Sequence, residues 1–202
     1  KVDSARQHIL NAIVARHFSE LTFVDTLQVF YSALHDYYYD KLQDASEDAD
    51  NLAKYTFSLR CQDLVYFTVH NIQDLPTRYR IADILISHPY FMYRTSAGHV
   101  TIWVDPKEGV TALISACRGL TGQHVSSILK KALQVFTLDP LEFEKFINHK
   151  EKCGFTALHA GVFDGNDSAI STLLGEMKNL SQVKIVNFEN FLTLRSIFNF
   201  TP

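Results

Sequence analysis

Histidine and cysteine are the residue types of this chain that could hold a metal ion or act as a nucleophile. The 202 residues include nine histidines and three cysteines, and His149, Cys153 and His159 have loosely ligand-like separations. A cysteine nucleophile would also need an adjacent base and an environment that lowers its pKa. A sequence repeat already accounts for Cys153 and His159, and Cys117 falls on the inward face of a predicted helix. We therefore expect no metal ion and no cofactor.

Sequence motifs of catalysis point the same way. The sequence has no glycine-rich phosphate loop, no G-x-S-x-G elbow, no H-E-x-x-H pair and no paired carboxylates suited to acid–base work. The prediction is a protein that is not an enzyme. A thiol enzyme is the alternative, and it would be discarded if iodoacetamide labelled no cysteine of the native protein.

The composition is that of an ordinary soluble globular protein, with 47% hydrophobic and 20% charged residues. Nineteen basic and 22 acidic residues give a net charge of -3, so no overall positive field attracts nucleic acid or an anionic membrane. No apolar run approaches the roughly 20 residues that span a bilayer. An odd number of scattered cysteines fits a reducing compartment, and we predict a cytoplasmic protein.

An internal repeat is the most informative feature of the sequence. The segment GFTALHAG at 154–161 recurs as GVTALISA at 109–116, an offset of 45 residues, and NFTP at 199–202 follows at the same offset. A fixed period of this size is typical of stacked-repeat architectures. The offset persists downstream, where apolar positions of one unit fall on those of the next: Val125, Ile128 and Leu129 on Ile170, Leu173 and Leu174.

The repeat resembles the ankyrin family. The resemblance is carried by Thr156-Ala157-Leu158-His159, Gly165-Asn166, Ile170 and Leu173-Leu174. The unit at 109–129 departs from the family pattern in having Ile114 where a histidine is usual and Leu120-Thr121 in place of a Gly-His turn, and the period exceeds the usual 33 residues. The long repeats and helical leader are also similar to ankyrin-containing effectors of intracellular bacteria such as Legionella, which would place the chain in a host cytosol. A divergent eukaryotic or viral ankyrin protein is the alternative.

The expected fold class is all-α, namely an ankyrin-like α-solenoid with a helical N-terminal cap and a β-hairpin finger. The cap covers residues 1–60, although a small separate helical domain is an alternative. The repeats cover 61–202, and comprise a degenerate unit at 61–106, units at 107–150 and 151–197, and the start of another at 198–202. Thr111 and Thr156 can each cap a helix, and the resemblance implies that His159 braces the turn of Thr156.

Periodicity and capping residues predict the remaining elements. Helices are expected over 3–17, from Thr22 to Leu42, and from Ser46 to Leu59. Alternating residues around Ser96-Ala97-Gly98 predict a β-hairpin over 91–104. Inserted helices or ordered loops are expected at 139–147 and 181–191, because each stretch opens with a capping residue.

The predicted function is a protein-interaction module, a scaffold or adaptor that binds a folded protein through the concave ankyrin surface. The alternative is the targeting half of a larger enzyme whose catalytic domain lies beyond Pro202. Phe163 and Trp103 are candidate aromatic anchors unless they pack within the stack, and Phe163→Ala or Arg118→Glu should weaken binding with little change in melting temperature. The resemblance implies these partner-binding residues: Asn71, Asp74, His99, Trp103, Lys107, Ser115, Arg118, Lys150, Lys152, Phe163 and Asp164.

Overall fold

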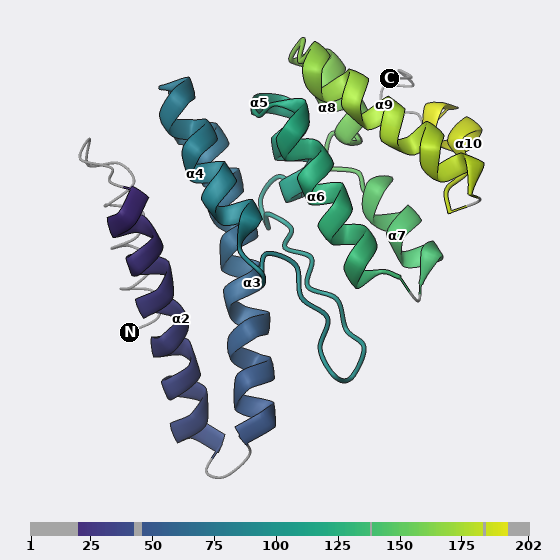
Figure 1. Ribbon diagram of the computed structural model, residues 1–202. Coiled ribbons are helices and arrows are strands. Elements are labelled where there is room, and N and C mark those ends of the chain that lie inside the picture. The colour runs from purple at the N-terminus through teal and green to yellow at the C-terminus, as the bar shows by residue number, and fades with distance from the viewer. Residues whose placement is uncertain (1–19, 43–45, 138, 184, 194–202) are drawn as a thin grey trace.

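A computed structural model describes residues 20–42, 46–137, 139–183 and 185–193, and the regular elements in these ranges are helices (Figure 1). The all-α prediction is confirmed. The helix predicted at 3–17 and the repeat opening at 199–202 lie outside the described residues. The helices are α2 (Glu20–Leu42), α3 (Ser46–Asn71), α4 (Leu75–Ser87), α5 (Ala112–Gly119), α6 (Gly122–Val135), α7 (Pro140–Ile147), α8 (Ala157–Phe163), α9 (Asp167–Gln182) and α10 (Phe188–Thr193).

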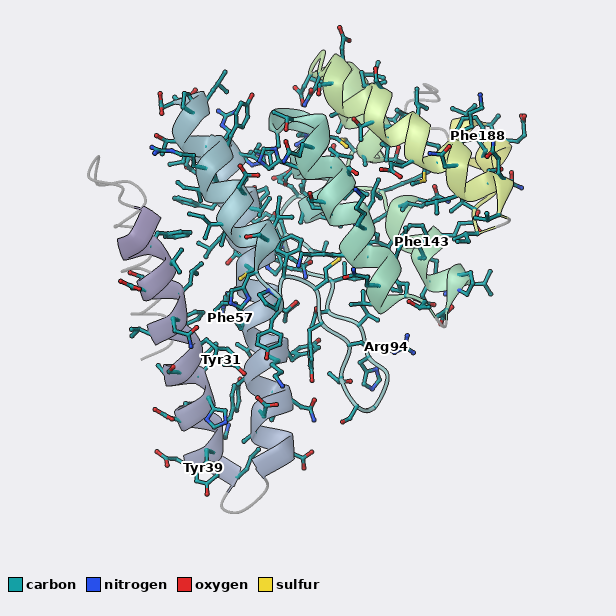
Figure 2. All side chains as sticks on the ribbon, in the orientation of Figure 1. Tyr31, Tyr39, Phe57, Arg94, Phe143 and Phe188 are labelled. Carbon is teal, nitrogen blue, oxygen red and sulfur yellow. The ribbon has the colours of Figure 1, made fainter. Side chains whose placement is uncertain are left out.

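The long helices α2 and α3 lie side by side as an antiparallel pair (Figure 1). On α2 the buried residues recur every three or four positions, as Phe23, Leu27 and Phe30 show, so one stripe faces the partner helix. Between the helices the rings of Tyr31 and Phe57 meet edge to face with centroids 5.4 Å apart (Figure 2). Aromatic packing of this kind joins the two helices along their length.

Helix α3 is longer than predicted and runs without interruption across residue 60. The sequence from Ser46 to Asn71 contains no glycine or proline, so nothing in it ends the helix at Leu59. The first half of α3 packs against α2, and the helix also contacts α4 and α5. The predicted N-terminal cap, residues 1–60, and the first helix pair therefore share one continuous helix, α3.

Three successive helix pairs lie side by side in the rest of the fold. The pairs are the end of α3 with α4, α5 with α6, and α8 with α9. The first helices contact one another in the order α3, α5, α8, and the second helices in the order α4, α6, α9 (Figure 1). The apolar positions of the repeat form the seam between the pairs, since Val125, Ile128 and Leu173 are fully buried.

The openings of α5 and α8 have the same local geometry. Gly109 and Gly154 have positive φ angles of 74° and 80°, a region that favours glycine. Two residues after each glycine, Thr111 and Thr156 cap the helices. The hydroxyl of each threonine accepts the backbone N–H of the residue three positions later. At Thr156 this is a capping box, because the His159 ring also accepts the Thr156 backbone N–H.

The elements between the pairs differ in part from the prediction. The predicted hairpin at 91–104 has one isolated antiparallel bridge, Arg94 to Val100, and a second bridge joins Val104 to Thr111 before α5, with no paired strands among the described residues. The helix at 139–147 is confirmed as α7, whose N-cap is Asp139. The element expected to open at Ser181 does not start there: Ser181 lies in the last turn of α9, and α10 begins at Phe188.

Candidate functional site

One face of the molecule collects most of the residues expected to bind a partner. It is built by the first helices α3, α5 and α8 and by the loops that precede α5 and α8. We call it the first-helix face, and its residues are Tyr66, Trp103, Lys107, Arg118, Lys152, Phe155, Phe163 and Asp164.

Arg118, in the last turn of α5, joins two neighbouring helix pairs. Its Nη2 donates to Oε1 of Glu151 over 2.6 Å, and its Nε lies 3.7 Å from Oδ2 of Asp164 at the end of α8. The Glu151 side chain is only 3% exposed, although its neighbours Lys150 and Lys152 are exposed. A carboxylate that is buried must be paired, so Arg118 is part of the framework as well as of the surface.

Cys153 completes the cluster around Glu151. Its Sγ donates to Oε1 of Glu151 over 2.7 Å, and burial followed by this hydrogen bond raises the pKa of the Cys153 thiol. Burial also raises the pKa of Cys117 to about 12 and raises that of Cys61. A thiolate is the reactive form of cysteine. These three side chains therefore stay protonated at neutral pH, which is the reverse of what a cysteine nucleophile needs.

Trp103 is half-buried and packs against α3. Its ring centroid lies 5.4 Å from that of Tyr66, and its backbone N–H donates to Oε1 of Gln62 over 2.9 Å. Burial, then the charges of Asp105 and Glu108, raise the pKa of Tyr66. Trp103 is thus held by the stack rather than projecting from it.

A backbone hydrogen bond joins the tips of the loops that precede α5 and α8. The Lys152 backbone N–H donates to the Glu108 carbonyl over 2.9 Å, and the Asp105 carboxylate accepts the N–H groups of Lys107 and Glu108 over 3.0 and 2.6 Å. A side chain that accepts backbone donors ahead of it fixes a tight turn. The exposed side chains of Lys107 and Lys152 therefore stand on ordered loops.

Phe163 is the large apolar side chain that this face exposes most. It is 75% exposed at the end of α8, beside Val162 at 48%, and its ring centroid lies 5.6 Å from that of Phe155. Contiguous exposed apolar side chains can mark a protein-binding site, and aromatic side chains often dominate the binding energy of an interface. Phe155 in turn stacks on the capping residue His159 at 5.6 Å, which fixes the platform beneath Phe163.

Ser115 was expected on this surface, and that expectation is wrong. Its exposed fraction is 0%, because α5 lies between α3 and α8 and its mid-helix positions face those neighbours. Four other expected residues are exposed at separate places on the structure. Asn71 ends α3, Asp74 caps α4 by accepting the Thr77 N–H, Lys150 precedes α8, and His99 lines a cavity on the loop of residues 94–102.

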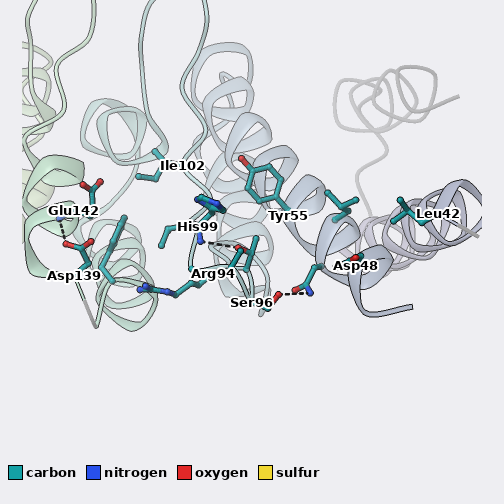
Figure 3. A pocket seen from close by; sticks show the side chains of 16 residues that line it. Leu42, Asp48, Tyr55, Arg94, Ser96, His99, Ile102, Asp139 and Glu142 are labelled. Atoms are coloured by element: carbon teal, nitrogen blue, oxygen red, sulfur yellow. Dashed lines mark hydrogen bonds between the residues drawn. The ribbon is translucent and has the colours of Figure 1, made fainter. Parts of the chain in front are cut away.

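That cavity has a volume of about 830 Å³ and lies between α3, the 94–102 loop and the junction of α6 with α7 (Figure 3). Its walls combine apolar groups such as Leu52 and Phe136 with Arg94. No sequence pattern predicted this cavity, because its walls come from segments far apart in the chain.

The sequence also did not predict Tyr66, Phe155 or the burial of Glu151 beside the Cys153 thiol. Of these residues only Phe155 has a signal in the sequence, because it directly precedes the capping residue Thr156. Among the described residues no three His, Cys, Asp or Glu side chains are grouped to hold a metal ion. None of the described helices is both long enough and apolar enough to cross a membrane. Comparison with family models, curated proteins and solved structures finds no match to this chain.

Proposed function

We propose that this chain is an interaction module of the ankyrin type, which binds a folded partner protein through the first-helix face. The observation that carries the proposal is the exposure of Phe163 on an ordered aromatic platform beside the Arg118 cluster. A face that spans three helix pairs is the surface that stacked-repeat proteins use for partners.

Local geometry supports the ankyrin part of the proposal. Both described openings pair a glycine of positive φ with a capping threonine, and the helix pairs contact first helix to first helix. The inserted helix α7 accounts for the long offset between units, since it lies between α6 and the loop that leads to α8. The 91–104 loop takes the place of a finger in this scheme.

The chemistry of the face specifies the partner. An apolar pocket on the partner would complement Phe163, and carboxylates around that pocket would complement the exposed Lys107 and Lys152 on the loop tips. The carboxylate of Asp164 is already beside Arg118. We therefore infer a partner surface with an apolar centre and an acidic rim. The three free cysteines, two of them buried, fit a reducing compartment such as the cytosol.

Site-specific photo-crosslinking tests this function. Benzoylphenylalanine replaces Phe163, and a matched control carries it at Val29, which is 68% exposed on α2. In lysate, position 163 is expected to capture one discrete protein, and a threefold excess of unlabelled chain should reduce the adduct. Excess Lys107→Glu/Lys152→Glu chain should fail to compete. The proposal fails if positions 163 and 29 give the same adducts, or if both competitors act equally.

A further inference from the structure

The cavity beside the 94–102 loop has extended backbone in its wall. The two arms of the loop meet through an antiparallel bridge between Arg94 and Val100. Around that bridge the Thr95 N–H donates to the His99 carbonyl over 2.8 Å, and the Thr101 N–H donates to the Tyr93 carbonyl over 2.9 Å. The inner side of this short ribbon is therefore hydrogen-bonded.

The outer side of the second arm is unpaired. Alternate residues of an antiparallel pair turn their N–H and C=O groups away from the partner arm, and here these are Val100 and Ile102. Within the described ranges neither backbone makes a hydrogen bond, and both residues line the cavity. Such an edge accepts another extended chain, which adds to it as a further strand.

The cavity next to this edge can take apolar side chains. Tyr55 and Leu52 of α3 line one wall, and Phe136 and Ile102 line the other side. Leu52 is 39% exposed, so an occupant would cover apolar surface that now faces solvent. A volume of about 830 Å³ is enough for two or three side chains of a peptide.

The charges around the cavity favour a basic occupant. Three carboxylates line it, with Asp139 and Glu142 on the α7 side and Asp48 on the α3 side (Figure 3). Among the lining side chains one guanidinium opposes them, that of Arg94, which already donates to the Val135 carbonyl over 3.0 Å. Outside the lining, Lys145 of α7 forms an ion pair with Glu142. Even with Glu142 paired, the carboxylates of Asp48 and Asp139 outnumber the one guanidinium of the lining, so the cavity complements lysine or arginine side chains.

We propose that an extended peptide segment of a partner protein pairs with the Val100–Ile102 edge. Its apolar side chains enter the cavity, and its alternate basic side chains meet the carboxylates at the rim. This site is independent of the first-helix face, and its success or failure leaves the function proposed above to be judged by its own experiment.

A synthetic peptide tests the proposal on the whole 202-residue chain. The probe is a blocked seven-residue peptide of alternating lysine and valine, titrated to millimolar concentration against isotope-labelled protein. Saturating peptide is expected to shift the Val100 and Ile102 amide resonances and to slow their hydrogen exchange at least tenfold. The same peptide with glutamate in place of lysine should not bind. No protection of these two amides, or equal binding of the acidic peptide, would overturn the proposal.

Two pairs of variants separate edge pairing from contact with the wall. Ile102→Pro and Ile102→Ala both lose the side chain, but only proline also removes the outward N–H, so the proline variant should bind at least tenfold more weakly than the alanine variant. Leu52→Asn should weaken binding tenfold, whereas the matched Val29→Asn on α2 should not change it. The Leu52 pair decides the matter if the proline variant does not fold, and equal affinities within that pair contradict the proposal.

Discussion

Arg118 shows how one residue can belong to a surface and to the framework beneath it. It is a quarter exposed, yet it neutralises a carboxylate in Glu151 that is almost fully buried. Arg118→Glu is therefore not the pure surface substitution that the sequence suggested, because it would set a second carboxylate against Glu151. Phe163→Ala does act at the surface alone, because a side chain that is 75% exposed contributes little to folding stability.

Removing the arginine should destabilise the protein. Arg118→Met leaves the Glu151 carboxylate buried with only the Cys153 thiol as donor, and should lower the free energy of unfolding by about 2 kcal/mol. Arg118→Met/Glu151→Gln should recover about 1 kcal/mol of this loss. Urea denaturation measures both values.

The control for that cycle is the exposed pair formed by Lys145 and Glu142 on α7. Lys145→Met should leave the midpoint of the urea transition unchanged, because exposed ion pairs contribute little. If Arg118→Met behaves like Lys145→Met, then Glu151 is not held by Arg118 in solution.

Single residues were predictable from sequence where a local rule applied. The capping roles of Thr111 and Thr156 follow from their places before an apolar segment, and the structure confirms both. Burial of Ser115 and Glu151 depends on which helices lie beside them, and a local sequence pattern does not predict those neighbours.

At the scale of elements, the contact between α6 and α9 depends on a glycine. A Cβ placed on Gly122 would lie 2.1 Å from Oγ1 of Thr172 and 2.6 Å from the Ser168 carbonyl oxygen. The Gly122 N–H also donates to Oγ of Ser168 over 3.0 Å. The first residue of α6 therefore touches α9 with backbone alone.

Two glycine substitutions test this contact. Gly122→Ala should lower the free energy of unfolding by about 2 kcal/mol or more, because the backbones of two helices must separate. Gly175→Ala, in α9 with no atom within 4 Å of the added Cβ, should raise it by about 0.5 to 1 kcal/mol through helix propensity. Thermal denaturation with matched buffers measures the two changes. Changes of the same sign would show that α6 and α9 are not packed as described.

Sequence signals located elements well where a helix has a marked beginning. Asp139 and Pro140 correctly predicted the start of α7, whereas the start predicted at Ser181 does not occur, because α9 continues through Gly175 to Gln182. Helix α3 likewise extends beyond its predicted end to Asn71, through a sequence without glycine or proline. Capping residues identify possible starts, and packing against neighbours decides which are used.

At the scale of the whole molecule, the offset of 45 residues anticipated which helices lie side by side. Residues one unit apart meet across the pairs: Asn166 Nδ2 donates to the Leu120 carbonyl over 2.7 Å, and the Tyr79 carbonyl lies 3.2 Å from Nε2 of His124. The cavity beside the 94–102 loop was not foreseen, because it joins parts of the chain that share no repeat position.

Hydrogen exchange of the complex with the protein captured at position 163 tests whether the first-helix face binds the partner. Binding through this face should slow exchange in α8, in the loop before α8 and at Lys107 and Glu108, with no change in α4 and α6. Protection confined to α4, α6 and α9, with α8 and both loops unchanged, would contradict it.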